Sequence, residues 1–139
     1  MKSKFADVSK VRKQALDFAE LALLEARHLE QRLENELEAV YAQMLAVEVP
    51  SRGDIALLQQ MGATKLVLQR QREEIERQLT AASTRVIQMQ EAYKRANLEF
   101  EKIKYLEEQE FEQYMKKMKQ KEQSDLDEVA LQLFSAGEK

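Results

Sequence analysis

The sequence is poor in the residues that cross-link a fold or end its helices and strands. Among its 139 residues there is no cysteine, one histidine, one proline and three glycines. The absence of cysteine excludes a disulfide framework and a thiolate metal site. Because proline and glycine mark loops, a chain with so few of them has few loops. This excludes a compact domain built from many short elements.

Aromatic residues are also scarce, at 6% of the chain, whereas charged residues make up 34%. Glu, Lys, Gln, Ala, Leu and Arg dominate the sequence. Such a composition is typical of long helices and coiled coils. We therefore expect an all-α fold.

The charges are grouped along the chain, although the net formal charge is only −3. Residues 1–13 are basic, residues 17–48 are acidic, and a short basic run extends over Lys116–Lys121. Neither basic group is interleaved with aromatic residues in the manner of a nucleic-acid-binding surface. We expect no nucleic acid among the partners.

The basic N-terminus is not followed by a continuous apolar run. Residues 14–24 are largely apolar, but Asp17 and Glu20 interrupt them. A secretory signal or a transmembrane helix needs a longer uninterrupted apolar segment. The sequence predicts neither of these, and hence no direct membrane insertion. The lack of cysteine fits the reducing cytoplasm.

One turn divides the chain. In the stretch 49–54, Pro50 cannot continue a helix and disfavours the helical conformation at Val49, while Asp54 can cap the helix that follows. The sequence thus predicts a helix at about 4–48, a turn at about 49–54 and a helix at about 55–122. Gly62 either loosens the second helix or ends a short helical segment at the tip.

Both predicted helices carry apolar residues at alternating steps of three and four, the spacing of a coiled-coil seam. In the second helix this seam runs from Leu68 to Ile103 with Arg72 as its one polar member. The expected seam of the first helix contains one extra step at Leu37 and consists of Phe5, Val8, Arg12, Ala15, Ala19, Ala22, Ala26, Leu29, Leu33, Leu37, Val40, Met44 and Val47.

Two such seams joined by a short turn predict an elongated antiparallel two-helix coiled coil, an αα-hairpin, with residues 1–139 forming a single domain. Folding at the predicted turn places Arg72 near Glu30 or Glu34. The first helix is then exhausted opposite residues 98–103, so the second helix overhangs beyond Ile103.

The far end of the chain has the pattern of a new helix start. Ser124 can cap, and Asp125, Asp127 and Glu128 suit the positive end of a helix dipole. We expect a short separate helix at about 125–134.

No group of residues has a catalytic or cofactor-binding pattern. Glu25 and His28 match the Glu-x-x-His of di-iron carboxylate bundles, but that site needs a second copy on a facing helix and the chain has no other histidine. Gly53 and Gly62 stand alone and form no phosphate-binding loop. The sequence therefore predicts no enzyme, no catalytic residue, no cofactor and no metal, and a solvated His28.

Apolar residues outside the seams are the candidates for partner contacts. The overhang offers either a docking surface or a surface for homo-oligomerisation, since exposed apolar patches often mark interaction sites. Tyr41 suits packing and partner contact equally, and Lys116–Lys121 is either a solvated face or a specific contact. The candidate partner-binding residues are Phe5, Val8, Tyr41, Met44, Leu45, Tyr105, Leu106, Phe111, Tyr114 and Met118.

Two stretches resemble a known family. Phe5-Ala6-Asp7-Val8-Ser9-Lys10-Val11-Arg12 resembles the opening apolar and basic helix of the flagellar export protein FliJ family. Lys121-Glu122-Gln123-Ser124-Asp125-Leu126-Asp127-Glu128-Val129-Ala130 is similar to the family's closing stretch, in which a basic and polar run leads to Asp-Glu and a small apolar face. The length, the single central turn and the longer second helix agree over essentially the whole chain.

The resemblance implies a cytoplasmic protein of the bacterial flagellar type III export apparatus, peripherally associated at the inner membrane and similar in fold to the stalk of rotary ATPases. It implies binding and activation of the export ATPase hexamer, and contacts with the ATPase regulator, the cytoplasmic domain of the export gate and export chaperones. A stalk in a ring would use the ends Phe5–Lys13 and Tyr105–Lys121. The family's gate-contacting surface lies nearer the closed end of the hairpin, where Tyr41, Met44 and Leu45 fall.

Other readings stay open at this point. Stalk proteins of needle-type secretion are a close alternative within the same class. A structural or chaperone-like coiled coil, acting as an oligomerisation or docking module, is the alternative from another class. Prefoldin-type holdases insert β-hairpins between their helices, and Val49–Asp54 has no room for one. A dimer formed end to end through the overhang remains compatible with the pattern.

Overall fold

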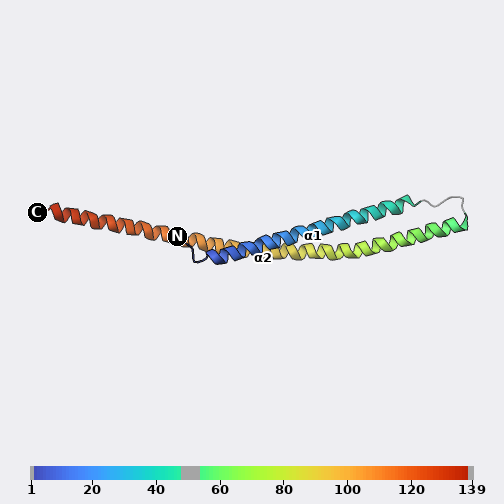
Figure 1. Cartoon of the computed structure of the whole chain (residues 1–139), viewed down its shortest axis with the longest axis horizontal. Coiled ribbons are helices and arrows are strands. Elements are labelled where there is room, and N and C mark those ends of the chain that lie inside the picture. The colour runs from blue at the N-terminus through green and yellow to red at the C-terminus, as the bar shows by residue number, and fades with distance from the viewer. Residues whose placement is uncertain (1, 48–53, 138–139) are drawn as a thin grey trace. The chain divides into compact units, whose positions relative to one another are not determined.

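The computed structural model describes residues 2–47 and 54–137 and consists of two long helices (Figure 1). Helix α1 spans Ala6–Ala46 and helix α2 spans Ile55–Gly137. The described residues contain no strand. The chain is an all-α helical hairpin, which confirms the predicted fold class.

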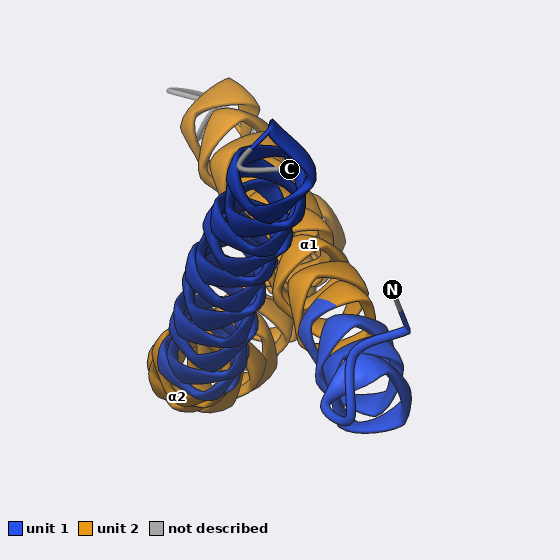
Figure 2. Cartoon of the chain, turned by 90° about the vertical axis from the view of Figure 1, so that its left-hand side faces the viewer, with its two compact units in different colours: residues 1–16, 96–139 blue, residues 17–95 orange. Residues whose placement is uncertain are grey.

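Both helices contribute to each of two compact units (Figure 2). Unit 1 combines residues 1–16 with residues 96–139, and unit 2 comprises residues 17–95. The single coiled-coil domain expected for the chain stays a prediction.

Within unit 2 the two helices run antiparallel. Leu23 and Ala26 of α1 cluster with Val86 of α2. Farther along α1, the Tyr41 hydroxyl donates a hydrogen bond to Glu76 Oε1 at 3.0 Å. Because higher residue numbers in α1 meet lower ones in α2, the helices point in opposite directions.

The seam of α2 is the one that the sequence predicts. Its members from Leu68 to Ile103 are all buried or half-buried, and Arg72 is half-buried among them. A strict alternation of four and three residues keeps these side chains on one helix face. The buried members are Leu68, Ile75, Ala82 and Val86.

The seam of α1 differs from the prediction in its first half. Leu16 and Leu23 are buried, whereas Ala15 is exposed and Ala22 half-buried. Leu29 likewise exposes 37% of its surface. The predicted members Ala19, Ala26 and Leu33 are buried or half-buried, so only the alternate members of the predicted seam are displaced by one residue. The observed seam continues to Leu37 without an extra step. Leucine buries more apolar area than alanine, which favours this face.

The helices also pair in a different register. Arg72 lies 3.7 Å from Glu76 Oε1 on its own helix, and Glu76 is bonded to Tyr41. The predicted neighbours Glu30 and Glu34 lie two to three turns before Tyr41 on α1. Since α1 ends at Ala46 and α2 begins at Ile55, the connection is longer than the predicted turn. The predicted turn residues 49–53 lie outside the described residues.

α2 is one continuous helix to Gly137, so the separate helix predicted at about 125–134 is wrong. The stretch around Ser124 contains no proline or glycine that would end a helix, and serine costs little inside one. Gln123 also donates a hydrogen bond to Asp127 Oδ1 at 3.1 Å, one turn later. The reading of Gly62 as the end of a tip segment is wrong for the same reason, because α2 passes through it.

α1 begins with a side-chain cap. The backbone N–H of Phe5 donates to Ser3 Oγ at 3.1 Å, and that of Ala6 donates to the Ser3 carbonyl at 3.2 Å. Such bonds satisfy amides that have no partner inside the helix. At the start of α2, the carbonyl of Asp54 accepts from Leu57 and Leu58. Neither described helix contains an apolar stretch that could cross a lipid bilayer.

Candidate functional site

In unit 1 the N-terminal segment of the chain shields one face of α2 as far as Glu110. The backbone N–H of Lys4 donates to Glu110 Oε1 at 3.3 Å. Glu107 and Glu110 are half-buried and continue the four-three spacing past Ile103. From Phe111 to Gly137 every residue is exposed. The overhang therefore starts after Glu110, and the predicted start after Ile103 is wrong, because the N-terminal segment reaches farther along α2. We call residues 111–137 the uncovered helix.

The last covered positions are acidic rather than apolar. Glu107 Oε1 and Glu110 Oε2 are shielded from solvent without a hydrogen-bond partner. A buried carboxylate oxygen without a partner costs free energy, so this end of the contact stabilises the hairpin little.

The predicted docking residues on α2 are exposed on both sides of this boundary. Tyr105 and Leu106, which precede it, expose 60% and 40% of their surfaces. Phe111, Tyr114 and Met118, which follow it, expose 55%, 37% and 38%. Contiguous patches of exposed apolar side chains often mark interaction surfaces.

Tyr105 and Leu106 line an apolar groove with Leu98, Glu101 and Lys102. Leu98 is 56% exposed and was not among the predicted site residues. Its spacing of seven residues from Tyr105 places both on one helix face, which is a signal that the sequence carries.

The N-terminal candidates lie in unit 1 as well. Phe5 is half-buried with Lys4 Nζ 5.1 Å from its ring centroid, and Val8 is 43% exposed. Ser3 lines a shared groove with Phe111 and the acidic residues around it. The structure thus brings the N-terminal segment to the start of the uncovered helix.

Cationic side chains fix Phe100 in unit 1. Lys13 Nζ from α1 and Lys104 Nζ from α2 both lie 5.6 Å from its ring centroid. A lysine over an aromatic face contributes about 0.5–1 kcal/mol at an exposed site. Lys13 therefore holds α1 against α2 close to the groove of Tyr105.

Tyr41, Met44 and Leu45 belong to unit 2. The hydrogen bond to Glu76 raises the pKa of the Tyr41 hydroxyl, with smaller contributions from desolvation and from the charge of Glu76. Tyr41 is still 42% exposed, so it combines a hydrogen bond to α2 with a surface open to solvent. Met44 is half-buried, whereas Leu45 exposes 87% of its surface.

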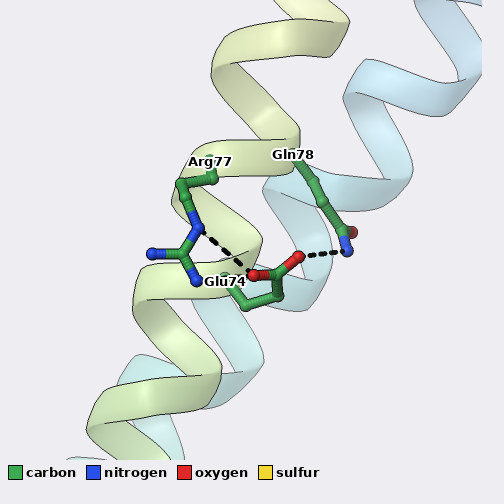
Figure 3. Close-up of polar contacts among 3 residues, drawn as sticks. All are labelled: Glu74, Arg77 and Gln78. Atoms are coloured by element: carbon green, nitrogen blue, oxygen red, sulfur yellow. Dashed lines mark hydrogen bonds and ion pairs between the residues drawn. The ribbon is translucent and has the colours of Figure 1, made fainter.

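An ion pair lies on α2 near Glu76. Glu74 accepts hydrogen bonds from Arg77 and, at 3.2 Å, from Gln78 (Figure 3). These donors lower the pKa of the Glu74 carboxyl, with Arg77 as the largest cause. The contact lies within one helix and strengthens α2 locally.

The basic run and the single histidine, which the sequence also offers as candidates, are exposed side chains. Lys116–Lys121 is exposed throughout, as is His28. In the described part of the chain, no three His, Cys, Asp or Glu side chains converge as metal ligands.

The comparisons with known proteins identify one family. No curated protein and no solved structure matches the chain significantly. The family model described as "Flagellar FliJ protein" matches residues 1–139, which is the whole chain. The match agrees with the two-helix fold and with the resemblance of the N-terminal and C-terminal stretches. The chain belongs to the FliJ family of flagellar proteins, whose members are components of the flagellar export apparatus.

Proposed function

We propose that this protein is the stalk of the flagellar export ATPase. The uncovered helix and the N-terminal segment would enter the central opening of the ATPase hexamer and stimulate its activity. The protein itself would catalyse no reaction. Its place would be the cytoplasm, at the membrane-embedded export apparatus of the inner membrane.

The observation that carries this proposal is the uncovered helix. In a hairpin, each helix normally hides its apolar face against the other. Here α2 continues for 27 residues beyond Glu110, with Phe111, Tyr114 and Met118 in solvent. The free energy from burying such side chains is then available to a partner, at about 25 cal/mol per Å² of apolar area.

The N-terminal segment adds to the same surface. Phe5 follows Lys4, whose backbone N–H donates to Glu110 Oε1, and Ser3 lines a groove with Phe111. Val8 lies one turn later on α1 and is 43% exposed. A ring that closes around the uncovered helix would also meet these residues. Lys116–Lys121 would supply cationic contacts to acidic residues of the ring.

We propose a second contact surface at Tyr41, Met44 and Leu45 for the cytoplasmic domain of the export gate. Leu45 is 87% exposed and lies one helical turn after Tyr41, whose hydroxyl donates a hydrogen bond to Glu76. A ring held in one orientation with an exposed leucine next to it suits a helical or extended apolar segment of a partner. The ATPase regulator and the export chaperones are further proposed partners, for which the family alone argues.

The stalk proposal is tested by ATPase stimulation. Purified export ATPase from the same organism is assayed for phosphate release with and without this protein. The triple variant Tyr105→Ser, Phe111→Ser and Tyr114→Ser should raise the concentration needed for half-maximal stimulation at least about tenfold, which corresponds to about 1.4 kcal/mol of binding free energy. Its helicity should be retained because all three residues are exposed.

The matched control replaces three other exposed apolar residues of α2, Leu66, Val67 and Ile87, by serine. It changes the same number of side chains at similar exposure and should stimulate normally. Equal loss in both variants, or normal stimulation by the Tyr105 variant, would refute the stalk contact.

A further inference from the structure

The apolar residues of the uncovered helix follow a symmetric pattern. Leu126, Val129 and Leu133 lie four, seven and eleven residues after Glu122. Met118, Met115 and Phe111 lie four, seven and eleven residues before it. All six side chains are exposed, between 38% and 69%. Steps of three and four place them on one helix face, with Glu122 at its centre.

The charges along this segment change sign at Glu122, whereas the apolar residues are placed symmetrically about it. The half before Glu122 is basic, with Lys116, Lys117, Lys119 and Lys121. The half after it is acidic, with Asp125, Asp127 and Glu128. A second helix turned end for end about Glu122 would bring basic residues level with acidic ones and apolar residues level with apolar ones.

We propose that residues 111–133 pair with the same segment of a second copy of this chain, antiparallel and about a two-fold axis at Glu122. Met118 then packs opposite Leu126, Met115 opposite Val129, and Phe111 opposite Leu133 of the other copy. Such an isologous interface is the common form of a symmetric dimer.

The charges fix the orientation. A parallel pair in register would set the lysines of Lys116–Lys121 against each other and the acids of Asp125–Glu128 against each other. Like charges at close range are destabilising, and opposite charges set the partner and its direction in coiled coils. Antiparallel pairing is the arrangement in which both the apolar and the charged pattern match.

The proposed dimer is weak because its paired segment is short and a like-charge contact lies at its centre. The paired segment spans 23 residues, roughly 34 Å of helix, which is close to the shortest length for a stable coiled coil. At the two-fold axis Glu122 meets Glu122 of the other copy, so two like charges face each other in the seam. The pairing therefore depends on protein concentration and is reversible.

The dimer has a consequence beyond the proposed stalk function. It covers Phe111 and Met118, which belong to the surface assigned to the ATPase ring. Self-association and insertion into the ring thus exclude each other, and the paired form is an inactive store of the protein.

Single-cysteine cross-linking tests the pairing, because the chain has no cysteine of its own. In an antiparallel dimer about residue 122, only that seam position faces itself. Met115→Cys alone should therefore give no disulfide-linked dimer. An equimolar mixture of Met115→Cys and Val129→Cys, which keeps Glu122 in both chains, should form one readily. Glu122→Cys should cross-link with itself, since a disulfide needs Cα atoms within about 7 Å.

A charge variant supplies an independent measurement. In the proposed dimer Lys116, Lys117 and Lys119 face Glu128, Asp127 and Asp125 of the other copy. Replacing these three lysines by glutamate sets acids against acids, and sedimentation equilibrium should give a dimer dissociation constant at least about tenfold higher than that of the unmodified protein. Reversing the acids as well, with Asp125, Asp127 and Glu128 changed to lysine, should restore self-association.

Two results would overturn the proposal. One is cross-linking of Met115→Cys with itself as fast as in the mixture, which would indicate parallel pairing. The other is an unmodified protein that stays monomeric at all concentrations, together with a mixture that does not cross-link. Neither measurement contains the ATPase, so a failure here leaves the stalk proposal to its own assay.

Discussion

The burial of Leu23 gives the most direct test of how α1 packs. Leu23 exposes 8% of its surface and clusters with Ala26 and Val86, with Met89 and Tyr93 packed against the cluster. Leu21, the same residue type two positions earlier on the same helix, exposes 53%. Replacing each by alanine removes the same atoms from the two environments and leaves helix propensity almost unchanged.

The expected cost follows from the area that each side chain hides. Leu23→Ala removes about three carbon atoms from a buried site, at about 0.8 kcal/mol each. A two-helix seam can close partly around the gap, so the cavity term stays small and we expect a loss of about 2–3 kcal/mol. For a chain of this length the loss lowers Tm by about 8 °C. Leu21→Ala should cost less than about 1 kcal/mol, since half of its side chain is already in water.

The assay is urea unfolding followed by circular dichroism, with a thermal scan as a second measurement. A change in midpoint at constant slope reports the change in free energy of unfolding. Equal losses for the two variants would refute the assignment of Leu23 to the seam. A larger loss for Leu21→Ala would place the seam of α1 on another face.

Three further changes probe local features. Gly62→Ala should raise the free energy of unfolding by about 0.5–1 kcal/mol, because Gly62 is helical and an added Cβ meets nothing within 4 Å; an unchanged or lower urea midpoint would contradict this. Glu76→Gln should lower the pKa of Tyr41 towards its ordinary value in an NMR titration; the raised pKa means that the bond stabilises the fold below the unfolded pKa and is lost as the pH rises through the folded one. Arg77→Ala should raise the pKa of Glu74, measured in the same way; the lowered pKa means that this contact stabilises the fold above the unfolded pKa and is lost as the pH falls through the folded one. A Tyr41 or Glu74 titration that does not move would show that the bond is not populated in solution.

The fold could be predicted because its signals are long and repeated. The seam from Leu68 to Ile103 holds one alternation over its whole length, so no other face of α2 competes with it. The first half of α1 offers two faces one residue apart. One contains Ala15 and Ala22, and the other contains Leu16 and Leu23. Both faces follow steps of three and four up to Leu33, but only the face with Leu16 and Leu23 reaches Leu37 without an extra step. That face also buries more apolar area, because it places leucine where the other has alanine.

The presence of an uncovered surface on α2 could be predicted, but its extent could not, and the partner contacts assigned to it stay a prediction. Apolar residues that leave the seam near the end of a long helix indicate an uncovered surface, and Phe111, Tyr114 and Met118 are exposed. The point where the cover ends depends on the register between the helices, which is a tertiary property. The prediction of a separate helix after Ser124 was wrong for a local reason. A capping residue can start a helix, but it does not end a helix that already runs through it.

The uncovered helix carries two patterns that demand different partners. Its exposed aromatic and methionine side chains suit any apolar surface, including a ring that surrounds them. The symmetry about Glu122 suits only a second copy of the same segment. A glutamate at the centre lowers the affinity of that copy, whereas a leucine there would complete the seam and strengthen it. If the dimer were the working form, such a residue would be favoured at this position. Both patterns have a use if the dimer is weak and the ATPase ring binds more tightly. A ring that binds only the monomer shifts the equilibrium from dimer to monomer by mass action.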